Sequence, residues 1–167
     1  MKILAIDPGP NQSGLLVWDG KTILYKEIVD NNQIIIEDLC SISADVLLVE
    51  QIKSLGMPVS DSIFDTVFWT GRFIQKWYGL WHRVPRREVK MHLCGSMRAK
   101  DSNIRQALID RLGEPGTKKN PGVTYVVKKD LWAALALAVY WMDRIQIPNR
   151  LDQMVDSVGE TNSPKES

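Results

Sequence analysis

The first fourteen residues constrain the fold more than any other stretch of this 167-residue chain. Lys2 to Ile6 is a short apolar run rich in β-formers, and residues 7–10 (D-P-G-P) stop it abruptly, which predicts a buried strand ending in one acid. A charged Asp is rarely buried unless it is paired or binds a cation. At the carboxyl end of an open α/β sheet, Asp7 would face the crevice where ligands bind. The alternative is that Asp7 only caps the turn.

A second buried strand repeats this pattern. Residues 14–18 and 22–29 flank Asp19-Gly20, a strong hairpin signal, so three antiparallel strands open the domain. Residues 31–41 predict a short crossover helix, and residues 45–50 (D-V-L-L-V-E) predict a fourth strand ending in Glu50. A crossover connection makes strands one and four parallel, so Asp7 and Glu50 would meet at one edge. Two bare acids repel each other, whereas a divalent metal between them removes the repulsion.

The rest of the chain predicts further elements around this sheet. Residues 60–78 predict a helix with Ser60 or Asp61 as its N-cap, and residues 82–84 predict a fifth strand. Residues 85–94 lead into a loop over 95–100, and Asp101 caps a helix in which Ile104 belongs to a single apolar stripe. Residues 113–122 predict an exposed loop rich in Gly, Pro and Lys. The fold class is therefore α/β, with a mixed five-stranded sheet flanked by helices.

The last predicted helix runs from Asp130 to about Arg144 and is apolar nearly all round, which predicts that it is buried. An acid such as Asp130 in a first helical turn is favoured by the helix dipole, so this position has a structural explanation as well as a functional one. We expect one domain over residues 1–147 and a polar, disordered tail over 148–167. No apolar run approaches a membrane span or a signal peptide, so we expect a cytoplasmic protein. Cys40 and Cys94 predict reduced packing residues.

Charge is distributed unevenly along the chain. Residues 81–129 carry 12 Lys and Arg against four acids, a balance of +8, although the whole chain carries only +1. This asymmetry is typical of a nucleic-acid-binding face, and the alternative is a solvated basic surface.

The helix predicted over 60–78 is apolar on two sides. Phe64, Phe68 and Gly71 follow one face, and a second apolar band follows another. Such a helix either lies deep in a core or packs against a partner as well as against the sheet. We favour a homodimer that uses Phe64, Phe68 and Gly71.

Together, these patterns resemble the Holliday-junction resolvases of the RuvC type, and their bacteriophage relatives in particular. The first motif is I-D-P-G at residues 6–9 with Gly14, and the second is L-V-E-Q at residues 48–51. The third is V-K at residues 89–90, followed by Gly95 and A-K at residues 99–100, and the fourth is D-L-W-A-A-L-A-L-A at residues 130–138. The four occur in the family's order and span residues 1 to 145.

The resemblance implies a ribonuclease-H-like fold and a metal-dependent endodeoxyribonuclease that cuts four-way and other branched DNA by paired nicks, as a homodimer without a nucleotide cofactor. It would act in the cytoplasm, that of a host if phage-encoded. Asp7, Glu50 and Asp130 would hold two Mg²⁺ ions, with Mn²⁺ as a substitute. Lys90 and Lys100 would act at the scissile phosphate. Backbone phosphates would be bound by further basic residues, namely Arg86, Arg87, Arg98, Lys118, Lys119 and Lys129, besides Lys90 and Lys100.

Two positions depart from the family pattern. Ala133 stands where the family usually has a second acid in the last helix, so a backbone carbonyl or water would take its place. Lys53 stands where many relatives place an aromatic wedge, which leaves Leu55 or Met57 as candidates for opening the junction.

Three rival interpretations stay open. The first is a non-catalytic junction-binding protein of the same fold, which Ala133 would permit. The second is a nuclease for structured RNA or a broader range of branched DNA. The third is half of an actin-like or sugar-kinase-like ATPase, against which the length of the chain argues.

Overall fold

The computed structural model describes residues 1–34, 39, 41–53, 56 and 58–159, with side chains described up to residue 145. Five strands form one mixed sheet: β1 (Ile3–Asp7), β2 (Gln12–Trp18), β3 (Ile23–Asp30), β4 (Val46–Gln51) and β5 (Leu80–Pro85). Their order is β3-β2-β1-β4-β5, with β1, β2 and β3 antiparallel and with β4 and β5 parallel to β1. This is the ribonuclease-H-like sheet that the sequence predicted.

The turn between β2 and β3 forms as the Asp19-Gly20 signal predicted. Gly20 has a φ of +100°, which other residues rarely adopt. The Asp19 carboxylate accepts hydrogen bonds from the backbone N–H groups of Lys21 (2.8 Å) and Thr22 (2.7 Å), and this closes the turn.

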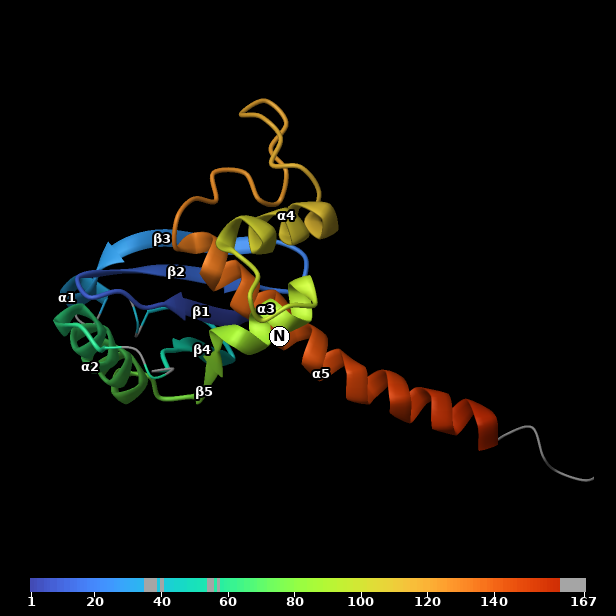
Figure 1. Ribbon diagram of the computed structural model, residues 1–167. Coiled ribbons are helices and arrows are strands. Elements are labelled where there is room, and N and C mark those ends of the chain that lie inside the picture. Colours follow the sequence, from blue (N-terminus) through green and yellow to red (C-terminus); the bar gives the residue numbers. More distant parts are fainter. Residues whose placement is uncertain (35–38, 40, 54–55, 57, 160–167) are drawn as a thin grey trace, which may run out of the picture.

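Helices cover both faces of the sheet (Figure 1). One face carries α2 (Asp61–Lys76), with the short α1 (Asn31–Gln33) near the end of β3. The other face carries α3 (Arg86–Cys94), α4 (Asp101–Leu112) and the first part of α5 (Leu131–Gly159). The C-terminal part of α5 extends away from the body of the domain.

Two apolar cores follow from the alternation of side chains along the strands. Ile3 and Ala5 of β1 point into the core shared with α3, α4 and α5. Leu4 and Ile6 point into the opposite core, which contains Phe73 of α2. Because both faces are covered, β1 and β4 read as continuous apolar runs rather than as alternating ones.

Three details differ from the sequence prediction. Helix α3 was not predicted, although Pro85 before it and Gly95 after it, with a φ of +66°, are ordinary helix boundary signals. Lys100, rather than Asp101, is the N-cap of α4. Helix α5 begins at Leu131 and continues to Gly159, past Arg144, because extending an existing helix adds a hydrogen bond per residue without a new nucleation cost.

The polar tail over residues 148–167 stays a prediction. Cys40, Leu55 and Met57 lie outside the described residues, and Cys94 is a free thiol. No helix in the described part of the chain is both long and apolar enough to cross a bilayer.

Candidate active site

Two acids lie at the carboxyl ends of adjacent parallel strands. The register pairs Ile6 of β1 with Val49 of β4, so the next residues along each strand are Asp7 and Glu50. The turn after Asp7 is held by a buried polar cluster: Ser13 donates to the Asn31 side chain (2.7 Å), and the Asn31 amide donates to the carbonyl of Gly9 (2.9 Å). Buried polar groups that are fully hydrogen-bonded make a segment rigid, so this cluster fixes the end of β1.

Asp130 reaches the same place because β2 has a glycine there. Gly14 is paired with Asp7 across the sheet. A Cβ atom at position 14 would lie 2.9 Å from the carbonyl carbon of Asp130 and 3.1 Å from its Cβ. The backbone of Asp130 can therefore pack directly on β2, beside Asp7, only because residue 14 has no side chain.

The surroundings of the Asp7 carboxyl disfavour its ionised form. Its pKa is raised from the ordinary value of 3.8 to about 8, chiefly by burial and then by the nearby Glu50 and Asp130 carboxylates, while Arg86 opposes the rise. The structure therefore gathers all three predicted acids into one electrostatic unit. A strongly perturbed carboxyl in such a position is typical of a functional site.

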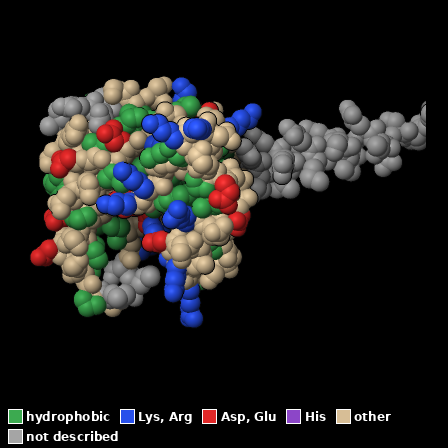
Figure 2. Space-filling model, turned by 90° about the horizontal axis from the view of Figure 1, so that it is seen from above, with side chains coloured by type: hydrophobic (Ala, Val, Ile, Leu, Met, Phe, Trp, Pro, Cys, Tyr) green, Lys and Arg blue, Asp and Glu red, His purple; other side chains and the backbone are tan. Residues whose placement is uncertain are grey.

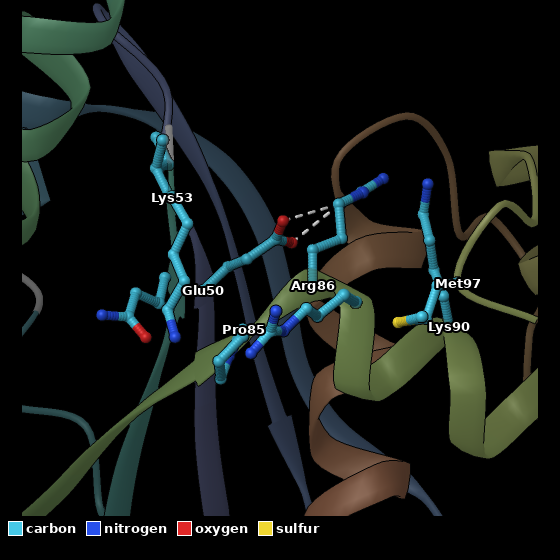
Figure 3. A pocket seen from close by; sticks show the side chains of 9 residues that line it. Glu50, Lys53, Pro85, Arg86, Lys90 and Met97 are labelled. Carbon is cyan, nitrogen blue, oxygen red and sulfur yellow. Dashed lines mark hydrogen bonds and ion pairs between the residues drawn. The ribbon is translucent and has the colours of Figure 1, made fainter. Parts of the chain in front are cut away.

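Arg86, at the start of α3, is the closest cationic partner of this unit. One terminal nitrogen of its guanidinium donates to both carboxylate oxygens of Glu50, at 3.0 and 2.7 Å (Figure 3). The other terminal nitrogen lies 2.6 Å from a carboxylate oxygen of Asp101. The Glu50 side chain is only 13% exposed, whereas that of Asp101 is 76% exposed. Arg86 therefore neutralises one predicted metal ligand directly.

The donor set fits a hard divalent cation in its chemistry. All three acids supply carboxylate oxygens, and Asp7 would keep a proton near neutral pH unless a cation took its place. In the part of the chain that the structure describes, no three His, Cys, Asp or Glu side chains are so arranged that they could hold a metal ion as they lie. Glu50 faces Arg86 instead, so it would have to turn away from Arg86 to bind a metal.

The predicted basic residues lie on different elements around this site. Arg87 and Lys90 belong to α3 and line a pocket of about 310 Å³ together with Glu50 and Arg86 (Figure 3). Arg98 and Lys100 are exposed in the connection to α4, and Lys129 is exposed directly before Asp130.

Lys118 and Lys119 are exposed in a loop that rises beyond α4 (Figure 1). A single bridge between Gly116 and Pro121 closes this loop. Figure 2 looks onto this side of the molecule and shows several groups of Lys and Arg side chains, with acidic side chains between them. The surface is thus basic in patches rather than uniformly.

Sequence reasoning missed two side-chain contacts and one unusual backbone conformation around the site. The Arg86–Glu50 ion pair was not foreseen, because Arg86 was assigned to DNA phosphates alone. Lys26 of β3 was also missed: its Nζ donates to the carbonyl of Tyr125 in the segment that leads to Asp130. In that segment Lys129 has a φ of +46°, so the backbone before Asp130 adopts a rare conformation. No pattern in the sequence marks either contact, because the partners are far apart along the chain.

The outer face of α2 is apolar, as predicted. Phe64, Val67 and Phe68 are 64%, 51% and 60% exposed, and nothing lies within 4 Å of a Cβ added at Gly71. Thr66, Thr70 and Phe73 form the buried face of α2. A single α-helix can bury one stripe against a sheet, which leaves the opposite stripe open.

Comparison with known proteins identifies the fold. No protein-family model matches the chain, and no curated protein matches its sequence. RuvC from Thermus thermophilus matches with a TM-score of 0.67 and 19% identity over 89% of this chain and 97% of RuvC. The same protein in complex with a Holliday junction substrate matches with a TM-score of 0.62 and 20% identity over 84% of this chain and 92% of the RuvC chain.

A second match is the yeast mitochondrial Holliday junction resolvase, with a TM-score of 0.56 and 13% identity over 84% of this chain and 78% of that one. At these identities the likeness establishes a ribonuclease-H-like fold of the same arrangement.

Proposed function

We propose that this protein is a metal-dependent endodeoxyribonuclease that nicks branched DNA, four-way junctions above all, as a homodimer. Three observations support the proposal: Asp7 and Glu50 follow paired residues of adjacent parallel strands, the backbone of Asp130 packs on Gly14 beside Asp7, and the charges of Glu50 and Asp130 help to raise the pKa of Asp7 to about 8. Neighbouring carboxylates repel one another, and divalent cations bound between them remove this repulsion. The fold is shared with structures of Holliday junction resolvases, which favours the same class of substrate.

The three acids would hold two Mg²⁺ ions, or Mn²⁺, which activate a water and stabilise the leaving oxygen at phosphorus. Lys90 lines the pocket beside Glu50, where its ammonium group would offset negative charge on the scissile phosphate. Lys100 would do the same from the N-cap of α4. Arg87, Arg98, Lys118, Lys119 and Lys129 would bind neighbouring phosphates without reading the sequence.

The decisive test is a cleavage assay on a fluorescent four-way junction with Mg²⁺. We expect paired nicks from the wild-type protein and no nicks from Asp7→Asn, because an amide cannot supply the negative charge that a cation requires. Junction binding should persist or tighten in this variant, since a negative charge near phosphate is removed. Asp65→Asn, at an exposed position of α2, is the matched control and should cleave normally. Cleavage by Asp7→Asn at the wild-type rate would rule Asp7 out as a metal ligand.

A second candidate function is junction binding without cleavage. The ion pair between Arg86 and Glu50 favours it, because a carboxylate held by a guanidinium is not free for a metal. Ala133 favours it too, since it supplies no acid to the site. The same assay separates the two functions: a shifted but intact junction in Mg²⁺ indicates a binding protein.

A further inference from the structure

The ion pair between Arg86 and Glu50 lies between the acids proposed to bind metal ions and the basic residues proposed to bind DNA. Arg86 is the first residue of α3 and follows β5 directly, and β5 pairs with β4 so that Glu50 lies opposite Val84. The guanidinium therefore stands between the acidic edge of the sheet and the basic helix α3. Its side chain is 33% exposed, so one side of it is open to solvent.

The open side of Arg86 faces a basic pocket. Besides Glu50 and Arg86, this pocket of about 310 Å³ is lined by Lys53, Arg87 and Lys90 (Figure 3). None of these three cations forms an ion pair with another described residue, whereas the pocket's one acid is already neutralised by Arg86. Three unpaired cations around one hollow favour an anion of the size of a phosphate group.

One terminal nitrogen of Arg86 donates to both carboxylate oxygens of Glu50, and the other donates to Asp101. A guanidinium binds phosphate oxygens as well as carboxylate oxygens, so a phosphate can replace a carboxylate at Arg86. The ion pair between Arg86 and its second partner, Asp101, costs little to break, because the Asp101 side chain is 76% exposed and water can solvate its carboxylate instead. Glu50, by contrast, would be left at the acidic edge beside Asp7 and Asp130, where a cation is needed.

We propose that Arg86 is a positioning residue that exchanges Glu50 for a backbone phosphate of DNA, so that DNA binding frees Glu50 for the acidic centre. This inference rests on the proposed function and deepens it. In the protein without DNA, Arg86 holds Glu50 and keeps the centre closed to divalent cations. When a phosphate enters the basic pocket, Arg86 turns to it and Glu50 is released.

A double-mutant cycle on DNA binding tests the exchange. The dissociation constant of a fluorescent four-way junction is measured in EDTA for the wild type, Glu50→Gln, Arg86→Ala and the double variant. Glu50→Gln should tighten binding by roughly fivefold to tenfold, the size of a typical coupling between interacting residues, because it releases Arg86 for phosphate. This gain should vanish when Arg86 is absent. If the gain came only from the lost negative charge of Glu50, it would be as large or larger in the Arg86→Ala background, and the proposal would be wrong.

Mn²⁺ binding provides an independent readout without DNA. Free Mn²⁺ is measured by electron paramagnetic resonance as it is titrated into each protein. Arg86→Ala should bind Mn²⁺ about tenfold more tightly than the wild type, because a cation has been removed from beside the carboxylates. Arg86→Lys keeps the charge but lacks the planar guanidinium that bonds Glu50 and Asp101 through separate nitrogens, so its affinity should lie between the two. An unchanged or weaker affinity in Arg86→Ala would overturn the proposal.

A matched control comes from the far end of α4. Arg111 also pairs with an aspartate, Asp143, so Arg111→Ala removes an arginine–carboxylate pair outside the site. It should leave Mn²⁺ affinity at the wild-type value, and thermal melts of all variants show whether they fold. Failure of the proposed function and failure of this inference are distinguishable. A wild-type protein that binds no junction DNA would contradict the proposed function. If the protein binds the junction but the effects of Glu50→Gln and Arg86→Ala on binding simply add, only the exchange at Arg86 is contradicted.

Discussion

At the scale of the residue, Gly14 decides whether the third acid can join the site. It contributes nothing chemical, yet Asp130 packs where its side chain would be. The first motif of the chain thus contains both a candidate metal ligand, Asp7, and the glycine, Gly14, whose missing side chain leaves room for the second candidate, Asp130.

We predict that Gly14→Ala separates folding from activity. The added methyl would lie 2.9 Å from the carbonyl carbon of Asp130, so the backbone must shift and Asp130 must move away from Asp7. We expect a stability loss of about 1–3 kcal/mol, typical of overpacking, and a loss of junction cleavage that is far larger than the loss of junction binding. Thermal melts, cleavage and binding assays check this.

The stability control for Gly14→Ala is Gly71→Ala, where a methyl meets nothing within 4 Å and the helical residue gains up to about 1 kcal/mol. Its melting temperature should rise. Full cleavage activity in Gly14→Ala would mean that the position of Asp130 does not matter.

The raised pKa of Asp7 predicts a pH dependence of stability in the absence of metal. Between the unfolded pKa near 3.8 and the folded pKa of about 8, the folded chain holds a proton that the unfolded chain has lost. The contribution of this group is therefore fully present below pH 3.8 and is lost as the pH rises through 8, at up to about 1.4 kcal/mol per unit. In EDTA, the wild type should lose stability between pH 5 and 8 relative to Asp7→Asn.

Urea unfolding at several pH values measures this difference, with Asp65→Asn as the exposed control that should follow the wild type. Parallel curves for the wild type and Asp7→Asn would show that Asp7 titrates normally. Saturating Mn²⁺ should remove the pH dependence, since a cation then replaces the proton.

At the scale of the element, the loop over residues 113–122 extends the basic surface away from the sheet. The bridge between Gly116 and Pro121 holds its two arms together, and Lys118 and Lys119 lie at its exposed end. A short hairpin-like loop of this kind presents charge without contributing to either apolar core.

We predict that changing Lys118 and Lys119 together to Ala weakens junction binding and flattens its salt dependence. If each lysine neutralises one phosphate, the slope of log K against log salt should fall in magnitude by about 2. Binding measured between 50 and 200 mM salt checks this.

The matched control for the loop changes Lys21 and Lys76 to Ala, two lysines outside the basic segment. It should leave the slope as in the wild type. An unchanged slope in the loop variant would remove the loop from the interface with DNA.

At the scale of the whole molecule, the outer face of α2 is the surface best suited to a second copy of the chain. Three large apolar side chains are more than half exposed on it. Arg72 lies 5.6 Å from the ring centre of Phe68 and 4.7 Å from that of Trp69, so a cation borders the apolar patch. An apolar patch with a polar border is typical of a protein interface.

We predict that Phe68→Asp yields monomers while the domain stays folded, because a charge at the centre of an apolar interface must be desolvated without a partner. Sedimentation velocity measures the change. The control is Leu24→Asp on β3, a side chain of similar exposure outside α2, which should leave the dimer intact. A wild-type protein that sediments as a monomer at every concentration would refute the dimer.

Much of the fold follows from local patterns. The hairpin at Asp19-Gly20, the acids near the carboxyl ends of β1 and β4 and the parallel pairing of these strands were predicted correctly, although β4 continues one residue past Glu50 to Gln51. Strand periodicity, turn residues and crossover handedness are local or nearly local rules. Helix α3 was missed because its polar composition hides a single buried residue, Val89.

The amino-acid sequence by itself determined the strands of the sheet and made Asp7 and Glu50 candidate site residues, because apolar runs and the residues that end them define strands wherever they occur. Only the tertiary structure decided that Arg86 holds Glu50 and that Gly14 makes room for Asp130. Both contacts join residues separated by 36 or more positions, and side-chain pairing at such separation depends on how the elements pack rather than on any local preference.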